Sequence, residues 1–424
     1  MKVETLDIAK YDRMVRLLER IDRYWKANPA ARSDRLYYEL LAGYYGRLQR
    51  AREQGKMVAA HTVLIPSEIL LAMDIVPQDM EFGSNMLVLV IREYEEAFSA
   101  AKAFGFAPEI CSAHRMLAGI YLKGWMPPPD MVIWTHLACD STPKTPELLR
   151  ELYGVPGFFL DRPYRHTPRA VKYYTREIED LVSFLEEFTR RQMDWDRLRE
   201  AVGLSRRMME LHREIYELRK ITPCPMANRR SFQMLVISHF YRGTREGVAF
   251  YEAVRDELRE RAVAHQGAGA EERFRLLSLF IPPQRDMKLL DWMQREHGAI
   301  IVADPHQSHW GEWDIDPSRP LESLAQRSFV SPLIRQCHGP AEEGLIGDSV
   351  ADALSHRAEG AIYWAHIGCK QSCAMIRVVK DALMDRAGIP TLVVDMDITD
   401  PSFVPEEEMM GELEGFFELL EDRR

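Results

Sequence analysis

The stretch Gly360–Asp400 constrains the fold of this chain most strongly. It begins with a β-rich apolar run, Ala361–Ile367, which stops at the sequence Gly-Cys-Lys-Gln-Ser-Cys. A helical pattern follows and ends at Gly388, and a second apolar run, Thr391–Val394, comes next. This order predicts a strand, a loop, a helix and a second strand, joined by a right-handed crossover in a parallel sheet. Cys369 then lies just past the carboxyl end of a strand, where open α/β sheets bind their ligands.

The same alternation occurs elsewhere in the chain and predicts two α/β lobes. Each lobe combines buried-strand runs with helical patterns that are bounded by Gly, Pro or capping residues. The further strands are expected at Met57–Leu64, Ile75–Pro77, Asp130–Leu137, Gly157–Leu160, Arg273–Phe280 and Gly298–Ala303. The helices expected in the lobes are Ile69–Asp74, Tyr94–Phe104, Met116–Lys123, Met287–Glu296 and Glu406–Arg424.

The length of 424 residues is too great for one compact core, so several domains are expected. Residues 1–54 are charged and helical in pattern, and residues 167–266 show no good strand. We therefore expect a helical cap at 1–54, an α/β lobe at 55–166, a helical bridge at 167–266 and a second α/β lobe at 267–424. The predicted fold class is α/β, with two doubly wound parallel-sheet lobes of the flavodoxin or Rossmann type.

Charge and hydropathy exclude several classes of protein. With 46% hydrophobic and 28% charged residues, the chain has the composition of a globular protein rather than a disordered one. The formal net charge of −10 argues against a nucleic-acid-binding protein, which normally has a basic face. The sequence contains no stretch typical of a membrane span and no signal-peptide core, so we expect a cytoplasmic protein that does not bind membranes.

Six cysteines occur, and three of them fall at positions that favour chemistry. Cys111 precedes a helix for which Ser112 is the expected N-cap, and a helix N-terminus favours a thiolate. Cys139 follows a predicted strand in the first lobe, as Cys369 does in the second. Taken singly, each cysteine is also explained as a small buried hydrophobe, which is our interpretation of Cys224.

Three dispersed thiolates suit an iron–sulfur cluster if both lobes present their sheet edges to a shared cleft. The sequence has no CxxC pair, so a zinc ribbon or a thioredoxin site is disfavoured, and it has no ferredoxin-type cysteine run. Three cysteine ligands leave one iron of a four-iron cluster with a non-protein ligand, while Cys373 and Cys337 are the candidates for an extra one. A cluster-free, two-lobed binding protein with cysteines in its core remains the alternative at this point.

Five blocks in this order carry a family resemblance: GKMVAAHTVLIPSEILLAMDIVP, CSAHRMLAGIYLKGWMPPPDMVIWTHLACD, VPGFFLDRP, RFRLLSLFIPPQRDMKLLDWMQREHGAIIVADP and GAIYWAHIGCKQSC–GIPTLVVDMD. The chain resembles the iron–sulfur subunits of 2-hydroxyacyl-CoA dehydratases and of ATP-dependent benzoyl-CoA reductases. The resemblance implies a [4Fe-4S] cluster bound by Cys111, Cys139 and Cys369, and an aromatic or 2-hydroxyacyl CoA thioester as substrate. It also implies a heterodimer with a related iron–sulfur subunit and an ATP-hydrolysing iron–sulfur activator, with no nucleotide bound to this chain.

Two features distinguish between the branches of this family. Many dehydratase subunits carry a cysteine in the early strand where this chain has His61. The Gly-Cys-Lys-Gln-Ser-Cys block, with His366 before it, looks more like the benzoyl-CoA reductase branch. We therefore expect a subunit that reduces an aromatic acyl-CoA in anaerobic aromatic degradation. A subunit of a (R)-2-hydroxyacyl-CoA dehydratase is the first alternative, and an electron-transfer or scaffold subunit without its own substrate site is the second.

Three further residues and one loop are candidates for supporting roles. Arg115, one helical turn after Cys111, is placed to direct its charge at the cluster or at a CoA phosphate, or to form a surface ion pair. His366 is a candidate proton donor to a reduced ring or hydrogen-bond donor to a cluster sulfur, and His61 is a second candidate catalytic residue. Both histidines are also explained as core imidazoles. The loop with Trp310 and Trp313 is expected to shield an apolar ring or to cover hydrophobic core.

Overall fold

The computed structural model of the chain describes residues 6–28, 31–137, 139–269, 271–308 and 315–424. The chain forms two compact units, each of which is assembled from separate segments. The first unit comprises Met1–Met209, Val236–Ala253 and Glu312–Val330, and the second comprises Glu210–Leu235, Val254–Gly311 and Ser331–Arg424. The four-part domain division expected from the sequence stays a prediction.

The described part of the first unit contains a four-stranded parallel sheet in the order β2-β1-β3-β4. Its strands are β1 (Val58–His61), β2 (Val76–Asp79), β3 (Met131–Thr135) and β4 (Gly157–Leu160). All residues of the two central strands, β1 and β3, are buried, as expected for strands that are covered on both faces. The chain runs from β1 to β2 on one side and then crosses to β3 on the other, so the strand order reverses between β1 and β3.

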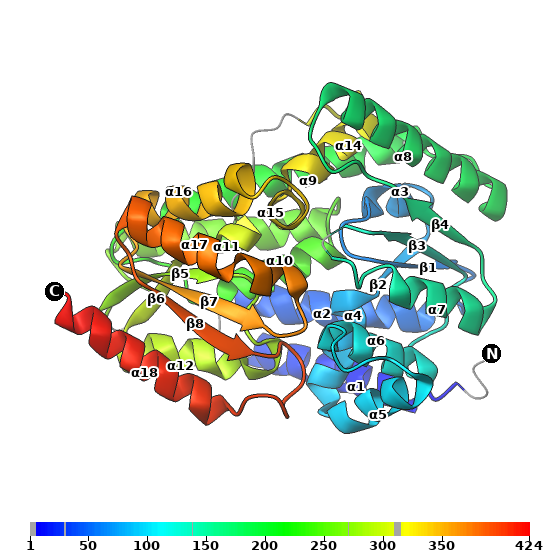
Figure 1. Ribbon diagram of the computed structural model, residues 1–424. Helices are drawn as coiled ribbons and strands as arrows, with labels where there is room; N and C mark the ends of the chain where they lie inside the picture. Colours follow the sequence, from blue (N-terminus) through cyan, green and yellow to red (C-terminus); the bar gives the residue numbers. More distant parts are fainter. Residues whose placement is uncertain (1–5, 29–30, 138, 270, 309–314) are drawn as a thin grey trace. The chain divides into compact units, whose positions relative to one another are not determined.

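Helices surround this sheet (Figure 1). They are α1 (Ala9–Ala27), α2 (Arg32–Arg50), α3 (Ser67–Ala72), α4 (Glu81–Ile91), α5 (Tyr94–Phe104), α6 (Ser112–Leu122), α7 (Lys144–Tyr153), α8 (Pro168–Thr189) and α14 (Pro320–Val330). Three more helices, α9 (Trp195–Leu218), α10 (Arg230–Phe240) and α11 (Arg245–Val263), contribute residues to both units. Helices α5 and α6 approach closely at Gly119, where a Cβ atom would lie 1.9 Å from the carbonyl oxygen of Ala97.

The second unit repeats the strand order of the first. Its described residues form a four-stranded parallel sheet in the order β6-β5-β7-β8. The strands are β5 (Phe274–Leu279), β6 (Ala299–Ala303), β7 (Gly360–His366) and β8 (Thr391–Met396). The helical elements are η1 (Gln284–Asp286), α12 (Met287–His297), α13 (Pro305–Ser308), α15 (Pro332–Cys337), η2 (Glu342–Ile346), α16 (Gly347–Ser355), α17 (Lys370–Ala387) and α18 (Glu406–Asp422). Here the strand order reverses between β5 and β7.

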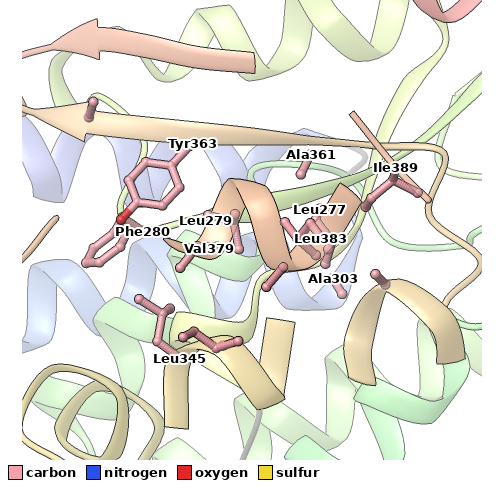
Figure 2. Close-up of a cluster of buried hydrophobic side chains, with 14 residues drawn as sticks. Leu277, Leu279, Phe280, Ala303, Leu345, Ala361, Tyr363, Val379, Leu383 and Ile389 are labelled. Carbon is pink, nitrogen blue, oxygen red and sulfur yellow. The ribbon is translucent and has the colours of Figure 1, made fainter. Parts of the chain in front are cut away.

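A buried apolar cluster holds α17 against this second sheet (Figure 2). Leu277 and Leu279 of β5 and Tyr363 of β7 meet Val379 and Leu383 on one face of α17, and all five side chains are fully buried. Helix α16 packs beside α17, while α12 and α18 pack together on the opposite face of the sheet (Figure 1). This packing fixes the start of α17, and therefore Cys369, relative to the end of β7.

The α/β fold class with two parallel sheets is confirmed, and some boundaries differ from those predicted. Strand β1 ends at His61 rather than continuing to Leu64, because Leu64 has a left-handed φ of 74° that a strand does not accommodate. Helix α4 was not predicted. Cys111, and not Ser112, is the N-cap of α6, and Ser112 is its first residue. In the described ranges, no helix combines the length and apolarity that crossing a membrane requires.

A buried ion pair attaches α14 to α3 in the first unit. Arg327 forms a bidentate pair with Glu68, with Nη2 3.0 Å from Oε2, and the Ser205 hydroxyl donates to Oε1 at 2.6 Å. Glu68 is 0% exposed. Burial by itself raises the pKa of Glu68, but the charges of Arg327 and Arg242 and the hydrogen bonds outweigh it and hold that pKa below its ordinary value.

We predict that Arg327→Met lowers the free energy of unfolding by about 3–5 kcal/mol, because it leaves a buried carboxylate without its partner. Urea denaturation at neutral pH measures this loss. Arg319→Met is the matched control, because Arg319 lies on the surface and pairs with Asp316 and Glu322, and little change is expected there. Equal stability of the Arg327→Met variant and the unmodified protein would show that the pair is not needed to hold α14.

Candidate functional site

Two cysteines occupy equivalent positions in the two units. Cys139 follows β3, and Cys369 follows β7, so each comes after the strand at which the strand order reverses. In open α/β sheets, the crevice at this reversal, outside the carboxyl ends of the strands, is the usual place for a ligand. The prediction that both thiols follow strands is confirmed.

Cys369 is the N-cap of α17. Its Sγ accepts a hydrogen bond from the backbone N–H of Ser372 at 3.4 Å, and its own backbone N–H donates to the carbonyl of His366 at 2.8 Å. A sulfur that accepts from a backbone amide at the positive end of an 18-residue helix is in a setting that stabilises a thiolate. Metal binding requires that thiolate form.

Cys111 occupies the corresponding position on a helix of the first unit. It is the N-cap of α6, and its carbonyl accepts from the backbone N–H groups of His114 and Arg115 at 3.0 and 3.1 Å. The partial positive charge of the helix N-terminus therefore acts on Cys111 as on Cys369. The predicted place of Cys111 at a helix start is confirmed.

Cys139 has two polar side chains beside its sulfur. The Sγ atom lies 3.2 Å from the Thr142 hydroxyl and 3.7 Å from Nε2 of His114, so α6 and the segment before α7 both reach it. Both neighbours also approach the Glu81 carboxylate at the start of α4, at 3.5 Å from Thr142 and 3.6 Å from His114. Burial raises the pKa of Glu81 to about 7, although the charge of His114 opposes this shift.

The two other candidate ligands lie in the second unit near Cys369. Cys373 is exposed on the first turn of α17, with its Sγ 3.5 Å from the His366 carbonyl. Cys337 ends α15, and its Sγ lies 3.7 Å from Nε2 of His306. Burial and the thiolate charges of these cysteines and of Cys369 all raise the pKa of the Tyr363 phenol, which donates to the Ser372 carbonyl at 2.8 Å. The Gln371 side chain, in the first turn of α17, donates to the Cys337 carbonyl, so Cys337 lies beside the turn that contains Cys373.

The structure places the remaining predicted residues in local contacts. His61 is buried in β1, with Nδ1 2.9 Å from the Thr62 carbonyl. His366 is buried at the end of β7, with Nδ1 3.8 Å from the Asp397 carboxylate. Arg115 donates from Nε to the Ile110 carbonyl at 3.0 Å, and its guanidinium lies over the Phe98 ring. Trp310 and Trp313 lie outside the described residues.

The predicted ligand set draws on both units, since Cys111 and Cys139 belong to the first and Cys369 to the second. Within the residues that the structure describes, no three His, Cys, Asp or Glu side chains are grouped so as to hold a metal ion. The chemistry of the donors nevertheless fits an iron–sulfur cluster, because Cys111 and Cys369 are helix N-cap residues and Cys139 has hydroxyl and imidazole neighbours. Ligation of one cluster by all three thiols stays a prediction.

Comparison with known proteins identifies the family. The model of the family "2-hydroxyglutaryl-CoA dehydratase, D-component" matches residues 62–420, which include all six cysteines. The chain belongs to this family. The family resemblance inferred from the sequence blocks is thus confirmed.

Members of this family with known activities include reductase and dehydratase subunits. A benzoyl-CoA reductase subunit of Thauera aromatica is 23% identical over 413 residues, which cover 91% of this chain and 94% of that protein. The (R)-phenyllactyl-CoA dehydratase alpha subunit of Clostridium sporogenes is 21% identical over 76% of this chain and 79% of its own length. The (R)-2-hydroxyisocaproyl-CoA dehydratase alpha subunit of Clostridioides difficile is 20% identical, with coverages of 91% and 95%. These identities do not select one substrate.

Sequence reasoning missed Glu81, His114 and Thr142. Glu81 lies two residues after the end of β2, so the rule that located Cys139 and Cys369 at strand ends would also have located this carboxylate. His114 lies one helical turn after Cys111, where it shares the N-terminal turn of α6. The contacts of both residues with Cys139 and its neighbours are long-range, and the sequence carries no local signal for them.

We predict that the cysteines of the metal-free folded protein differ strongly in their rates of alkylation. Cys373 is exposed, whereas Cys224 is 0% exposed, so Cys224 should react at least about ten-fold more slowly. Timed N-ethylmaleimide labelling followed by peptide mass spectrometry measures both rates. In urea the two rates should converge. Rapid labelling of Cys224 in the folded protein would contradict its interpretation as a core residue.

Proposed function

We propose that this chain is the iron–sulfur, substrate-binding subunit of a benzoyl-CoA reductase-type complex, which uses low-potential electrons to reduce an aromatic acyl-CoA. The observation that carries the proposal is the equivalent placement of Cys139 after β3 and Cys369 after β7. In each sheet, this is the strand at which the strand order reverses. The match with the benzoyl-CoA reductase subunit of Thauera aromatica, over nearly the full length of both chains, supports the reductase branch.

In this proposal, Cys111, Cys139 and Cys369 bind a [4Fe-4S] cluster. The helix N-termini at Cys111 and Cys369, and the Ser372 amide, stabilise the thiolates that binding requires. The bound cluster supplies single low-potential electrons. With three protein ligands, one iron remains accessible to a non-protein ligand. Cys373 and Cys337 remain the candidates for an extra ligand, since Cys373 lies one helical turn after Cys369 and the Gln371 side chain of the same turn donates to the Cys337 carbonyl.

The other residues are proposed to serve the substrate. His366 is the candidate proton donor because it is buried three residues before Cys369 and faces the Asp397 carboxylate, and His61 is the corresponding candidate in the first unit. Arg115 remains a candidate for pairing with a CoA phosphate. The proposed partners are a related iron–sulfur subunit and an ATP-hydrolysing activator, and the subunit names of the relatives support a complex of several chains. No nucleotide site is proposed on this chain.

Dehydration of a (R)-2-hydroxyacyl-CoA is the second candidate function. The family description and the dehydratase relatives favour it, whereas His61 in place of an early cysteine argues for the reductase branch. A subunit that only carries electrons or supports its partner is the third candidate.

We predict that the chain, produced with its partner and purified under strict anaerobiosis, is brown and contains about four irons and four sulfides per chain. With ATP, activator and reductant, the complex should consume benzoyl-CoA faster than it removes water from (R)-2-hydroxyacyl-CoA thioesters. Iron analysis and thioester chromatography measure these quantities. Benzoyl-CoA should also change the electron paramagnetic resonance spectrum of this subunit, which a purely electron-carrying subunit would not show. Colourless, iron-free protein would overturn the proposal.

A further inference from the structure

The environment of Cys139 differs from that of Cys369 in what contacts the sulfur. The hydrogen bond to Cys369 comes from a backbone amide, which every residue other than proline would supply at that position. The sulfur of Cys139 instead lies 3.2 Å from the Thr142 hydroxyl and 3.7 Å from the His114 imidazole. Side chains therefore determine the polarity around Cys139, and substitution can remove each contact separately.

The protonation state of the sulfur determines the direction of these hydrogen bonds. A thiol could donate its proton to the Thr142 oxygen, but a metal-bound thiolate has no proton and can only accept. Toward such a sulfur, the Thr142 hydroxyl can act only as the donor. His114 is 5% exposed, and its Nδ1 atom has no hydrogen-bond partner among the described residues. A neutral His114 therefore gains most by carrying its proton on Nε2, which lies 3.7 Å from the sulfur and 3.6 Å from the Glu81 carboxylate.

Glu81 links the two donors. Its Oε1 lies 3.5 Å from the Thr142 hydroxyl and 3.6 Å from Nε2 of His114, while its Oε2 accepts from the backbone N–H of Val63 at 2.5 Å. The backbone bond fixes the carboxylate, and the carboxylate holds both side chains on the same side of Cys139. Glu81 also competes with the sulfur for the two protons.

We propose that Thr142 and His114 are positioning residues which donate hydrogen bonds to the Cys139 thiolate and set the reduction potential of the cluster, with Glu81 orienting both. This inference rests on the proposed function, because it requires a cluster bound through Cys139. Hydrogen bonds to a ligand sulfur stabilise the more negative, reduced state of an iron–sulfur cluster and so raise its potential. Each donor that is removed lowers the potential.

The test is a redox titration of the anaerobic complex, monitored by electron paramagnetic resonance. Thr142→Val removes the hydroxyl at nearly constant volume and should shift the midpoint potential of this subunit to more negative values. Thr142→Ser retains the hydroxyl donor and should have the midpoint potential of the unmodified protein. Thr145→Val is the matched control, because Thr145 is also buried, three residues after Thr142 in the first turn of α7, and its hydroxyl has no hydrogen-bond partner among the described residues. It should leave the potential unchanged.

Glu81→Gln provides a second variant that does not depend on retention of the cluster by Thr142→Val. Replacing the carboxyl group by an amide removes the negative charge of its ionised form and leaves a weaker acceptor, so the potential should shift to more positive values, opposite to the shift in Thr142→Val. General damage to the site would move both variants in the same direction. Unchanged potentials in Thr142→Val and Glu81→Gln, with a full iron content, would overturn the inference. Absence of iron from the unmodified complex would instead overturn the proposed function.

Discussion

The thiolate at the start of a helix, beside the end of a parallel strand, is the interaction on which the account of this protein depends. A sulfur in that position receives the backbone N–H groups and the positive end of the helix dipole, which favour the charged form that iron binds. Cys369 has this setting at the start of α17, after β7, and Cys111 shares the position at a helix start, as the N-cap of α6. The sheets and their apolar cores serve to hold these helix starts in place, as the cluster around Tyr363 and Leu383 does for α17.

The groups around the cysteine that follows β3 differ from those around the cysteine that follows β7. The strand order is the same in both sheets, and a cysteine follows the reversal strand in each. In the second unit, the backbone N–H of Ser372 donates to the sulfur of Cys369, and Cys373 lies on the same helical turn. In the first unit, a carboxylate, an imidazole and a hydroxyl converge on Cys139. The shared topology therefore determines where Cys139 and Cys369 lie, and the local contacts determine the polarity around each sulfur.

The sequence predicts the regular elements well where turn residues limit them. Strand β4 and helix α5 have the predicted bounds, because a Pro and a Gly mark their ends clearly. Helix α4 was missed because its continuous apolar run, Met86–Ile91, lacks a helical period and is buried on most sides. The polar network on Cys139 was missed for a different reason, since its members are far apart in sequence and only the folded sheet brings them together.

The central claim is that three separate thiols from the two units hold one cluster, and the most direct test is the iron content of single cysteine variants of the anaerobic complex. The account predicts that Cys111→Ser, Cys139→Ser and Cys369→Ser each lose most of the roughly four irons of this subunit. Cys224→Ala, which alters a buried cysteine outside the set, should keep them all. Full iron occupancy in any one of the three serine variants would contradict the account.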